Sequence, residues 1–222
     1  NIDFIAYRGE ILGISGLVGA GRTELLQCIF GMTNPDHGTI YIDGIQTYVK
    51  DPRKAIASKM ALLTEDRKHQ GLILESSVRE NLNLVVLDKS CRSVFLNEAL
   101  RSKNAKEAID QLKIKVSTDA QLAGQLSGGN QQKVVIGKWS VTDADIYIFD
   151  EPTKGIDVGA KIEVYNIMNK LVAEDKCVIM ISSELPEIIG MSDRTIVMRE
   201  GKKMAEIDRN SKHFNQEAIM SA

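Results

Sequence analysis

Cysteine is scarce in this sequence, and the few cysteines present follow no metal-binding or disulfide pattern. Cys28, Cys91 and Cys177 are the three cysteines among 222 residues, an odd number with neither CxxC spacing nor paired histidines. This arrangement argues against a disulfide framework and against a zinc site. It favours a reducing, cytosolic compartment.

Two further features are missing, and each excludes a class of function. No apolar run approaches the roughly 20 residues that a membrane-spanning helix needs, and the first residues do not resemble a signal segment. We therefore expect any membrane role to work through a partner. Lys and Arg number 28 against 30 Asp and Glu, for a net charge of −2, so the charge balance does not favour nucleic acid as the main partner.

The hydrophobic pattern predicts an α/β domain. Hydrophobic residues make up 43% of the chain, enough to bury a core, and residues 1–222 are expected to form one domain with a subdomain. An edge strand is expected at 1–8, further strands at 11–14, 38–43, 146–149, 178–181 and 195–199, and helices at 23–30, 97–112 and 161–173. This order indicates a core formed by 1–75 and 140–222, interrupted by a helical subdomain at 76–139.

A glycine-rich loop lies between the first buried strand and the first helix. Its residues 16–23, Gly-Leu-Val-Gly-Ala-Gly-Arg-Thr, have the spacing of a phosphate-binding P-loop. Glycines at these positions let backbone N–H groups converge on phosphate oxygens, and the helix N-terminus adds its positive dipole end. The predicted nucleotide-binding residues are Gly16, Gly19, Ala20, Gly21, Arg22, Thr23 and Glu24, with Thr23 also a ligand of Mg²⁺.

Two other interpretations of this loop stay open. A dinucleotide-binding G-x-G-x-x-G motif would start at Gly19, but its third glycine would fall on Glu24, which would crowd helix and strand. A plain glycine turn with a surface arginine is the second alternative. Arg22 itself is unusual, because a P-loop normally has a lysine there. A planar guanidinium keeps the charge but changes the geometry around the γ-phosphate, which predicts nucleotide binding with poor catalysis.

Two acids end the strand predicted at 146–149. Asp150 and Glu151 would lie at the carboxyl edge of the sheet, where α/β proteins bind their ligands. We expect Asp150 to hold Mg²⁺ through water and Glu151 to act as the general base toward the attacking water. A buried strand followed by two solvated acids is also common without any such function.

The segment Leu126-Ser-Gly-Gly-Asn-Gln-Gln-Lys resembles the signature motif of ATP-binding-cassette (ABC) proteins. Ser127 is suited to cap the helix that begins there, and Gly128 and Gly129 leave bare N–H groups facing outward. In the family, this surface contacts the γ-phosphate of ATP held by an opposing domain. The resemblance implies a P-loop NTPase fold with a RecA-like parallel or mixed sheet, helices on its faces and a helical insertion. It also implies ATP and Mg²⁺ as cofactors, and a signature surface formed by Leu126, Ser127, Gly128, Gly129, Asn130 and Gln131.

Nearly the whole chain resembles one branch of this family, the C-terminal half of the duplicated ATPase of ribose, galactose and xylose type importers. In the wider family, a loop glutamine stands where this sequence has Glu65, and a switch histidine stands where it has Ser183. The matching stretches are Gly9-Glu-Ile-Leu-Gly, Gly19-Ala-Gly-Arg-Thr-Glu, Thr64-Glu-Asp-Arg-Lys, Leu126-Ser-Gly-Gly-Asn-Gln-Gln-Lys, Asp150-Glu-Pro-Thr-Lys-Gly-Ile-Asp-Val-Gly-Ala-Lys and Ser182-Ser-Glu-Leu-Pro-Glu.

The altered residues suggest a division of labour between the two halves of such a subunit. With Arg22, Glu65 and Ser183 replacing the usual lysine, glutamine and histidine, this half's own site is expected to be degenerate. Its intact signature is expected to complete the site of the N-terminal half. Asp157 resembles the family's dimer-contact aspartate, although a helix cap explains it equally well.

The resemblance also implies partners and a location. They are the N-terminal nucleotide-binding half, membrane permease subunits docked on the segment 65–82, and indirectly a periplasmic or lipid-anchored sugar-binding protein, with no nucleic acid. The location is the cytoplasmic face of the membrane, as a peripheral protein, and the family's first strand is expected to precede residue 1. A solvated charged loop at 65–82, a non-transport cassette ATPase and a non-catalytic regulatory half remain the alternatives.

Overall fold

Six strands form one mixed sheet in the order β10-β9-β1-β8-β7-β4 in this computed structural model, which describes residues 2–92 and 95–221. β1 pairs in parallel with both β8 and β9, β7 pairs in parallel with β8, and β10 pairs antiparallel with β9. Every residue of β1 and β8 is buried, as expected for strands covered on both faces. The strands are β1 (Ile11–Ser15), β4 (Met60–Leu63), β7 (Ile146–Asp150), β8 (Cys177–Ile181), β9 (Arg194–Arg199) and β10 (Lys202–Asp208).

The chain forms two compact units. Unit 1 comprises residues 1–62, 145–152 and 168–222, and unit 2 comprises 63–144 and 153–167. The sequence-based division at 76–139 stays a prediction. The two divisions differ because unit 2 also takes in 63–75, 140–144 and 153–167.

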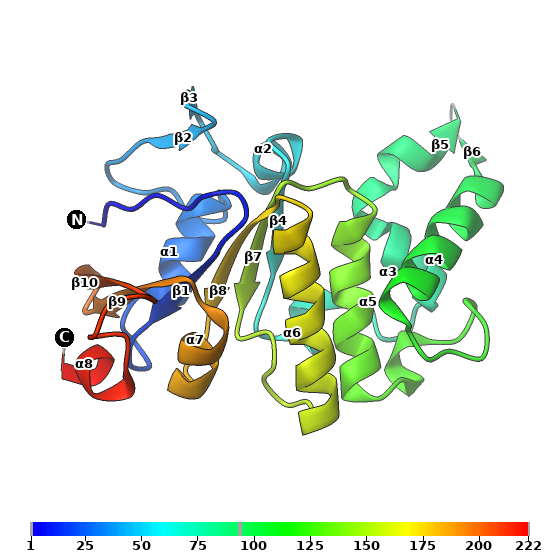
Figure 1. Ribbon diagram of the computed structural model, residues 1–222. Coiled ribbons are helices and arrows are strands. Elements are labelled where there is room, and N and C mark those ends of the chain that lie inside the picture. The colour runs from blue at the N-terminus through cyan, green and yellow to red at the C-terminus, as the bar shows by residue number, and fades with distance from the viewer. Residues whose placement is uncertain (1, 93–94, 222) are drawn as a thin grey trace. The chain divides into compact units, whose positions relative to one another are not determined.

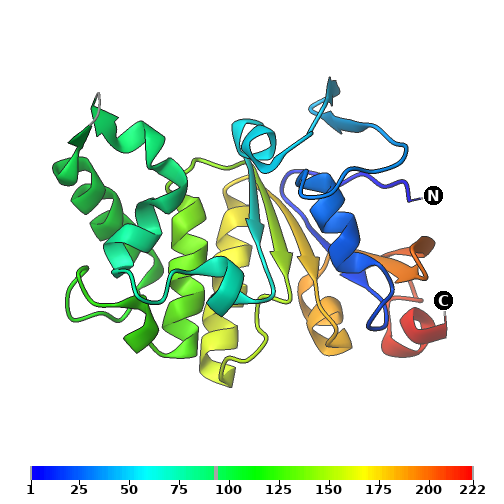
Figure 2. The same ribbon diagram turned by 180° about the vertical axis from the view of Figure 1, so that it is seen from behind.

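Unit 1 contains nearly all of the sheet and four short helices. Figures 1 and 2 together show α1 and α7 on opposite faces of the sheet. A small hairpin of β2 and β3 stands apart from the sheet. These elements are α1 (Arg22–Ile29), β2 (Ile40–Ile42), β3 (Ile45–Thr47), α2 (Pro52–Ala57), α7 (Leu185–Met191) and α8 (Gln216–Ser221).

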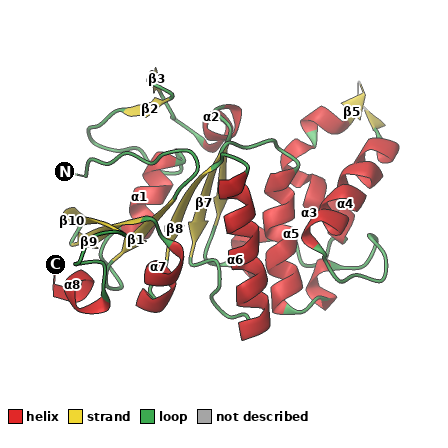
Figure 3. Cartoon of the chain, in the orientation of Figure 1, coloured by secondary structure: helices red, strands yellow, loops and turns green. Residues whose placement is uncertain are grey.

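Unit 2 is built mainly of helices, as the colouring by secondary structure in Figure 3 shows. Helices α3, α4 and α5 pack on one another, and α6 begins in unit 2 and continues into unit 1. The elements are the π-turn η1 (Arg67–Gly71), α3 (Val78–Asn83), the 3₁₀ turns η2 (Leu84–Val86), η3 (Asp88–Ser90) and η4 (Ala123–Gln125), the short strands β5 (Cys91–Arg92) and β6 (Phe95–Leu96), and the helices α4 (Glu98–Leu112), α5 (Gly128–Ser140) and α6 (Val158–Ala173).

Most predicted elements of the core are confirmed, and one is wrong. Residues 2–8 form no strand, and Asn1 lies outside the described residues. The backbone carbonyls of this segment accept bonds from side chains instead of a neighbouring strand: Arg194 Nη2 donates to Ile5 O (2.6 Å), and Lys203 Nζ donates to Asp3 O (2.6 Å). Alternation alone does not make a strand where no partner strand supplies a ladder. Among the described residues, no helix is both long enough and apolar enough to cross a bilayer.

Candidate nucleotide site and signature surface

The glycine loop of unit 1 depends on backbone conformations that favour glycine. Gly16, Gly19 and Gly21 have φ values of 154°, 83° and 90°. A Cβ on Gly16 would lie 2.4 Å from the Met198 carbonyl oxygen, so no larger residue fits there. These glycines let the chain turn sharply from β1 into α1.

The same loop fits an anion such as a phosphate group. Gly21 is the N-cap residue of α1, and no side chain caps this helix. The N–H groups of the first turn therefore lack a side-chain acceptor, and the helix dipole favours negative charge there. Leu17 and Val18 are 81% and 90% exposed, and a Cβ on Gly19 would meet nothing within 4 Å, so the tip of the loop is open.

The other predicted residues of the loop lie around this helix start. Ala20 is buried, and its N–H already donates to Leu17 O (3.0 Å). Thr23 is half-buried and Glu24 is exposed in the first turn of α1. Asp150 ends β7 and is 4% exposed. Its role and that of Thr23 toward Mg²⁺ stay predictions, and a hydroxyl and a carboxylate are the oxygen donors that Mg²⁺ takes.

Arg22 is bonded to the protein rather than open to solvent. It is 8% exposed, its Nη1 donates to the backbone oxygen of Ser182 (2.9 Å), and its Nη2 lies 3.4 Å from Glu151 Oε1. Two of its guanidinium nitrogens are thus engaged with two segments at the ends of neighbouring strands. A plain glycine turn with a surface arginine is excluded by this burial.

Glu151 is held between Arg22 and Ser183. Ser183 Oγ donates to Glu151 Oε2 (3.1 Å), so each carboxylate oxygen has a partner on the protein. Glu151 has a φ of 48°, in the left-handed region that non-glycine residues seldom adopt. We call Arg22, Glu151, Ser182 and Ser183 the Arg22 cluster.

The signature turn begins α5 in unit 2, as expected. Ser127 is the N-cap residue and its side chain accepts from the N–H of Asn130, while Asn130 Nδ2 also donates to Ser127 Oγ (3.0 Å). Asn130 Oδ1 in turn accepts from the N–H of Lys115 (2.9 Å). Asn130 therefore stabilises the turn through bonds to both Ser127 and Lys115.

Gly129 is required for packing within unit 2, and Gly128 lies in close contact with its neighbours there. A Cβ on Gly128 would lie 2.9 Å from Arg67 Nη2, and one on Gly129 would lie 2.5 Å from the Cβ of Ala160. Gly129 is buried, so the outward-facing part of the motif is the exposed Ser127 with the half-buried Gly128. This close packing is an addition to the sequence-based prediction, which assigned both glycines to the surface.

The rest of the signature helix is anchored through its buried side chains. Leu126 is buried, and Gln131 Nε2 donates to Ala123 O (3.2 Å). Lys133, 2% exposed, donates to Lys113 O (3.0 Å) and pairs with Glu163 Oε2 (2.7 Å). Because a lone buried ammonium is costly, these two partners are what permit Lys133 to be buried.

Glu65 pairs with a residue that the sequence did not single out. Its Oε1 lies 2.5 Å from Lys154 Nζ, and both side chains are partly exposed. Arg67 donates from Nη1 to Lys154 O (2.8 Å) and from Nη2 to Gly155 O (2.9 Å). Both stretches, 64–68 and 150–161, carry acidic and basic residues, so the sequence alone did not single out this pair.

A second buried lysine ties η1 to the signature helix. Lys138 Nζ donates to the backbone oxygen of Gly71 (2.6 Å). Burial lowers the pKa of Lys138 to about 8. A Cβ on Gly71 would lie 3.0 Å from Val135 Cγ2, so the turn lies directly against α5.

Asp157 acts as a helix cap. Its Oδ1 accepts from the N–H of Ala160 (3.0 Å), in the position of a cap for α6. The capping interpretation is confirmed, and the dimer contact stays a prediction.

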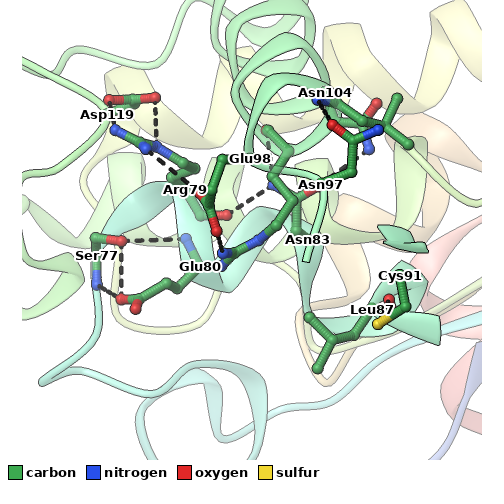
Figure 4. A network of polar contacts seen from close by, with 12 residues as sticks. Ser77, Arg79, Glu80, Asn83, Leu87, Cys91, Asn97, Glu98, Asn104 and Asp119 are labelled. Atoms are coloured by element: carbon green, nitrogen blue, oxygen red, sulfur yellow. Dashed lines mark hydrogen bonds and ion pairs between the residues drawn. The ribbon is translucent and has the colours of Figure 1, made fainter. Parts of the chain in front are cut away.

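A network of polar contacts fixes helix α3 within unit 2 (Figure 4). Arg79 forms two parallel bonds to Asp119, with Nε and Nη2 donating over 2.8 and 2.9 Å. Ser77 and Glu80 form a capping box at the start of α3. The buried Asn83 donates to the backbone oxygens of Arg79 and Arg101, both at 2.9 Å, and joins α3 to α4.

A mostly parallel sheet with a glycine loop and helix start after one strand and paired acids after another is the arrangement of a P-loop NTPase. The chain matches the model of the ABC transporter family over residues 1–154. The chain therefore belongs to the ABC transporter family.

Curated relatives match almost the full chain. A ribose import ATP-binding protein (RbsA) of Geobacillus kaustophilus strain HTA426 is 47% identical over 222 residues, which are 100% of this chain and 44% of that protein. A xylose import ATP-binding protein (XylG) of Thermoanaerobacter pseudethanolicus is 50% identical over 221 residues, 99% of this chain and 43% of that protein. The chain thus spans less than half the length of these relatives.

Solved structures show the same fold. The dimeric structure of a post-hydrolysis state of the ATP-binding cassette MJ0796, bound to ADP and Pi, is similar with a TM-score of 0.79 at 24% identity. The match covers 95% of this chain and 90% of that one. This likeness confirms the predicted P-loop NTPase fold.

Proposed function

We propose that this chain is the C-terminal nucleotide-binding half of the ATPase subunit of an ABC importer for a pentose or related monosaccharide. The observation that supports this most is its similarity, over nearly its whole length, to less than half of the ribose and xylose import ATP-binding proteins named above. Its partners would be the N-terminal half of the same subunit, the permease subunits and, indirectly, a sugar-binding protein. It would act at the cytoplasmic face of the membrane.

Within that subunit, the chain's own site would bind ATP and Mg²⁺ without efficient turnover. The glycine loop keeps the conformations and open tip that a phosphate needs. The Arg22 cluster supports the loss of turnover, because the guanidinium of the loop's basic residue pairs with Glu151 instead of being free to bind a phosphate. Bound Mg²⁺ would supply charge neutralisation at the phosphates, with Thr23 and Asp150 as its holders.

The signature would serve the other site. Ser127 is exposed at the start of α5, where the helix dipole and the first N–H groups favour an anion. That anion would be the γ-phosphate of the ATP on the N-terminal half. The chain's contribution to catalysis is then a preorganised set of donors, a contribution worth about 10²–10³-fold in rate when one donor is removed.

The test uses the full-length subunit with two single variants. Ser127→Arg places a bulky cation at the signature and should abolish ATP hydrolysis. Glu151→Gln should leave most of it, because this carboxylate is not the base that turns over ATP. Comparable losses from both variants would contradict the division of labour.

A second candidate is a non-catalytic regulatory half. The burial of Arg22 against Glu151 favours it for the isolated chain, since both groups are satisfied without nucleotide. Phosphate release above background by the isolated chain would exclude it.

A further inference from the structure

Arg67 connects three segments of unit 2 that the sequence motifs treat separately. They are the segment 64–71, the loop 153–157 that follows the paired acids, and the signature turn that begins α5. Its two terminal nitrogens donate to consecutive carbonyls, those of Lys154 and Gly155. A Cβ on Gly128 would lie 2.9 Å from the same Nη2 atom, so the guanidinium packs against the first residue of α5.

The geometry of this contact requires an arginine. A guanidinium offers a rigid fork of donors that matches two acceptors at once, whereas an ammonium is a single point charge. Gly155 has a φ of 68°, a turn conformation suited to glycine. Gly155 O would also lie 3.3 Å from a Cβ on Gly128, which brings the turn and the helix start into contact around Arg67.

A second charged contact holds the same two segments together. Arg67 binds the backbone oxygen of Lys154, and the Lys154 ammonium forms a salt bridge with Glu65. The carboxylate of Glu65 is therefore paired with a cation of the same unit. We call Glu65, Arg67, Lys154 and Gly155 the Arg67 clasp.

The far end of η1 is also attached to the signature helix. Gly71 packs on Val135 and accepts from Lys138, both in α5. The turn is thus fixed to α5 at Gly128 through Arg67 and again near Val135. Helical residues 128 and 135 are separated by about 10 Å along the axis, so two attachments this far apart oppose rotation of the turn against the helix.

We propose that Arg67 is a positioning residue that sets the place of Ser127 and Gly128 relative to the segment 65–82. This rests on the proposed function, in which the signature serves the partner's ATP, and on the expected docking of the permease on the segment 65–82. A displacement of η1 is then transmitted through the guanidinium to the signature turn. The clasp makes the signature respond to the permease.

The experiment uses the full-length subunit reconstituted with its permease, and compares Arg67→Lys with the control Arg209→Lys. Both guanidinium groups donate to two backbone oxygens, but Arg209 lies in unit 1, outside the segment 65–82, and binds Gly190 and Ser192. Arg67→Lys should lower the permease-stimulated kcat for ATP at least about tenfold and leave KM within about twofold, since small misplacements of reacting groups cost up to about 10²-fold. Arg209→Lys should leave both constants near wild type.

A charge reversal provides the rescue arm. Glu65→Lys and Lys154→Glu should each lower kcat, and the double variant should recover at least half of the loss. Hydrogen exchange supplies a readout without turnover: Arg67→Lys should speed exchange of the amides at 129–131 in the isolated chain, while those of β8 stay protected.

Each outcome decides the proposal. Equal losses for Arg67→Lys and Arg209→Lys, or no change in exchange at the start of α5, would overturn it. The variant Ser127→Arg separates this inference from the function on which it rests. If Ser127→Arg abolishes hydrolysis and Arg67→Lys does not lower it, only the clasp is wrong; if Ser127→Arg keeps full activity, the donated signature itself is wrong.

Discussion

The glycine loop of unit 1 and the signature turn of unit 2 are both helix starts with glycines, yet their charged neighbours are used differently. In the loop, the basic residue Arg22 turns to the protein's own Glu151. In the signature turn, Arg67 and Lys133 bond to backbone oxygens and a glutamate, and Ser127 remains exposed. Two helix starts with glycines can therefore differ in whether a neighbouring basic side chain pairs with a carboxylate of the same unit or the N-cap residue stays exposed.

The largest expected effect concerns Arg22. Its pair with Glu151 is buried on both sides, with side chains 9% and 10% exposed. Arg22→Ala leaves a buried carboxylate with one partner fewer, so we expect the free energy of unfolding to fall by about 3 kcal/mol. Urea denaturation of the isolated chain measures it.

The control for this prediction is the double variant Arg22→Ala with Glu151→Gln, which removes the uncompensated charge and should recover part of the loss. If Arg22 instead serves mainly as a nucleotide ligand, Arg22→Ala will weaken ATP binding and hardly change stability. That result would mean that the glycine loop, like the signature turn, remains available to an anion.

The pH dependence of stability distinguishes the signature helix from the loop. Burial holds the pKa of Lys138 at about 8 against 10.5 for the free side chain. The unfolded chain therefore binds more protons between these values, and stability should rise with pH from about 8 to about 10.5 by up to about 3 kcal/mol. Below pH 8 Lys138 is charged in both the folded and the unfolded chain, so the full cost of burying its charge is present.

The variant Lys138→Met isolates this contribution. Its stability curve should lack the rise, so the difference between wild type and variant should change across the window from pH 8 upward. Parallel curves would show that Lys138 titrates normally in the folded chain. Alkaline urea titrations of both proteins measure the difference.

Glycine packing at the signature gives a smaller effect. Gly129→Ala adds a Cβ that would lie 2.5 Å from that of Ala160, and overpacking of this kind costs about 1–3 kcal/mol. Gly190→Ala is the matched control in α7, where a Cβ meets nothing within 4 Å. The control should be neutral or stabilising by up to about 1 kcal/mol, because alanine is the better helix former. Thermal unfolding of the two variants side by side tests the contrast.

Asp157 provides the smallest effect. Asp157→Ala removes the cap on the Ala160 N–H and should cost about 1 kcal/mol, whereas Asp157→Asn keeps an acceptor and should cost little. If Asp157→Asn is stable but lowers ATP hydrolysis in the full subunit, the residue also acts at the interface between halves. Unfolding and turnover of both variants separate the two roles.

The sequence predicted the elements that local pattern determines. The strand at 11–14, the glycine loop and the helix after it, and the strand before Asp150 are all present, because apolar runs and glycine spacing specify them locally. The strand expected at 1–8 failed, since pairing depends on a neighbour that alternation does not reveal.

The direction of the charged side chains was beyond sequence reasoning. Arg22 was expected to face phosphate, but its partner Ser182 lies 160 positions further along the chain. Glu65 and Lys154 are 89 positions apart, and each is an ordinary charged residue when viewed alone. Only the fold brings such residues together, so the contacts of these side chains could not be predicted from the motifs.

ATP turnover by the isolated chain, beside the same chain mixed with its N-terminal half, tests the central claim most directly. The account predicts binding without turnover by the chain alone, and turnover in the mixture that Ser127→Arg abolishes. Robust turnover by the chain alone would mean that Arg22, Glu65 and Ser183 suffice for catalysis, and the division of labour between the two sites would be wrong.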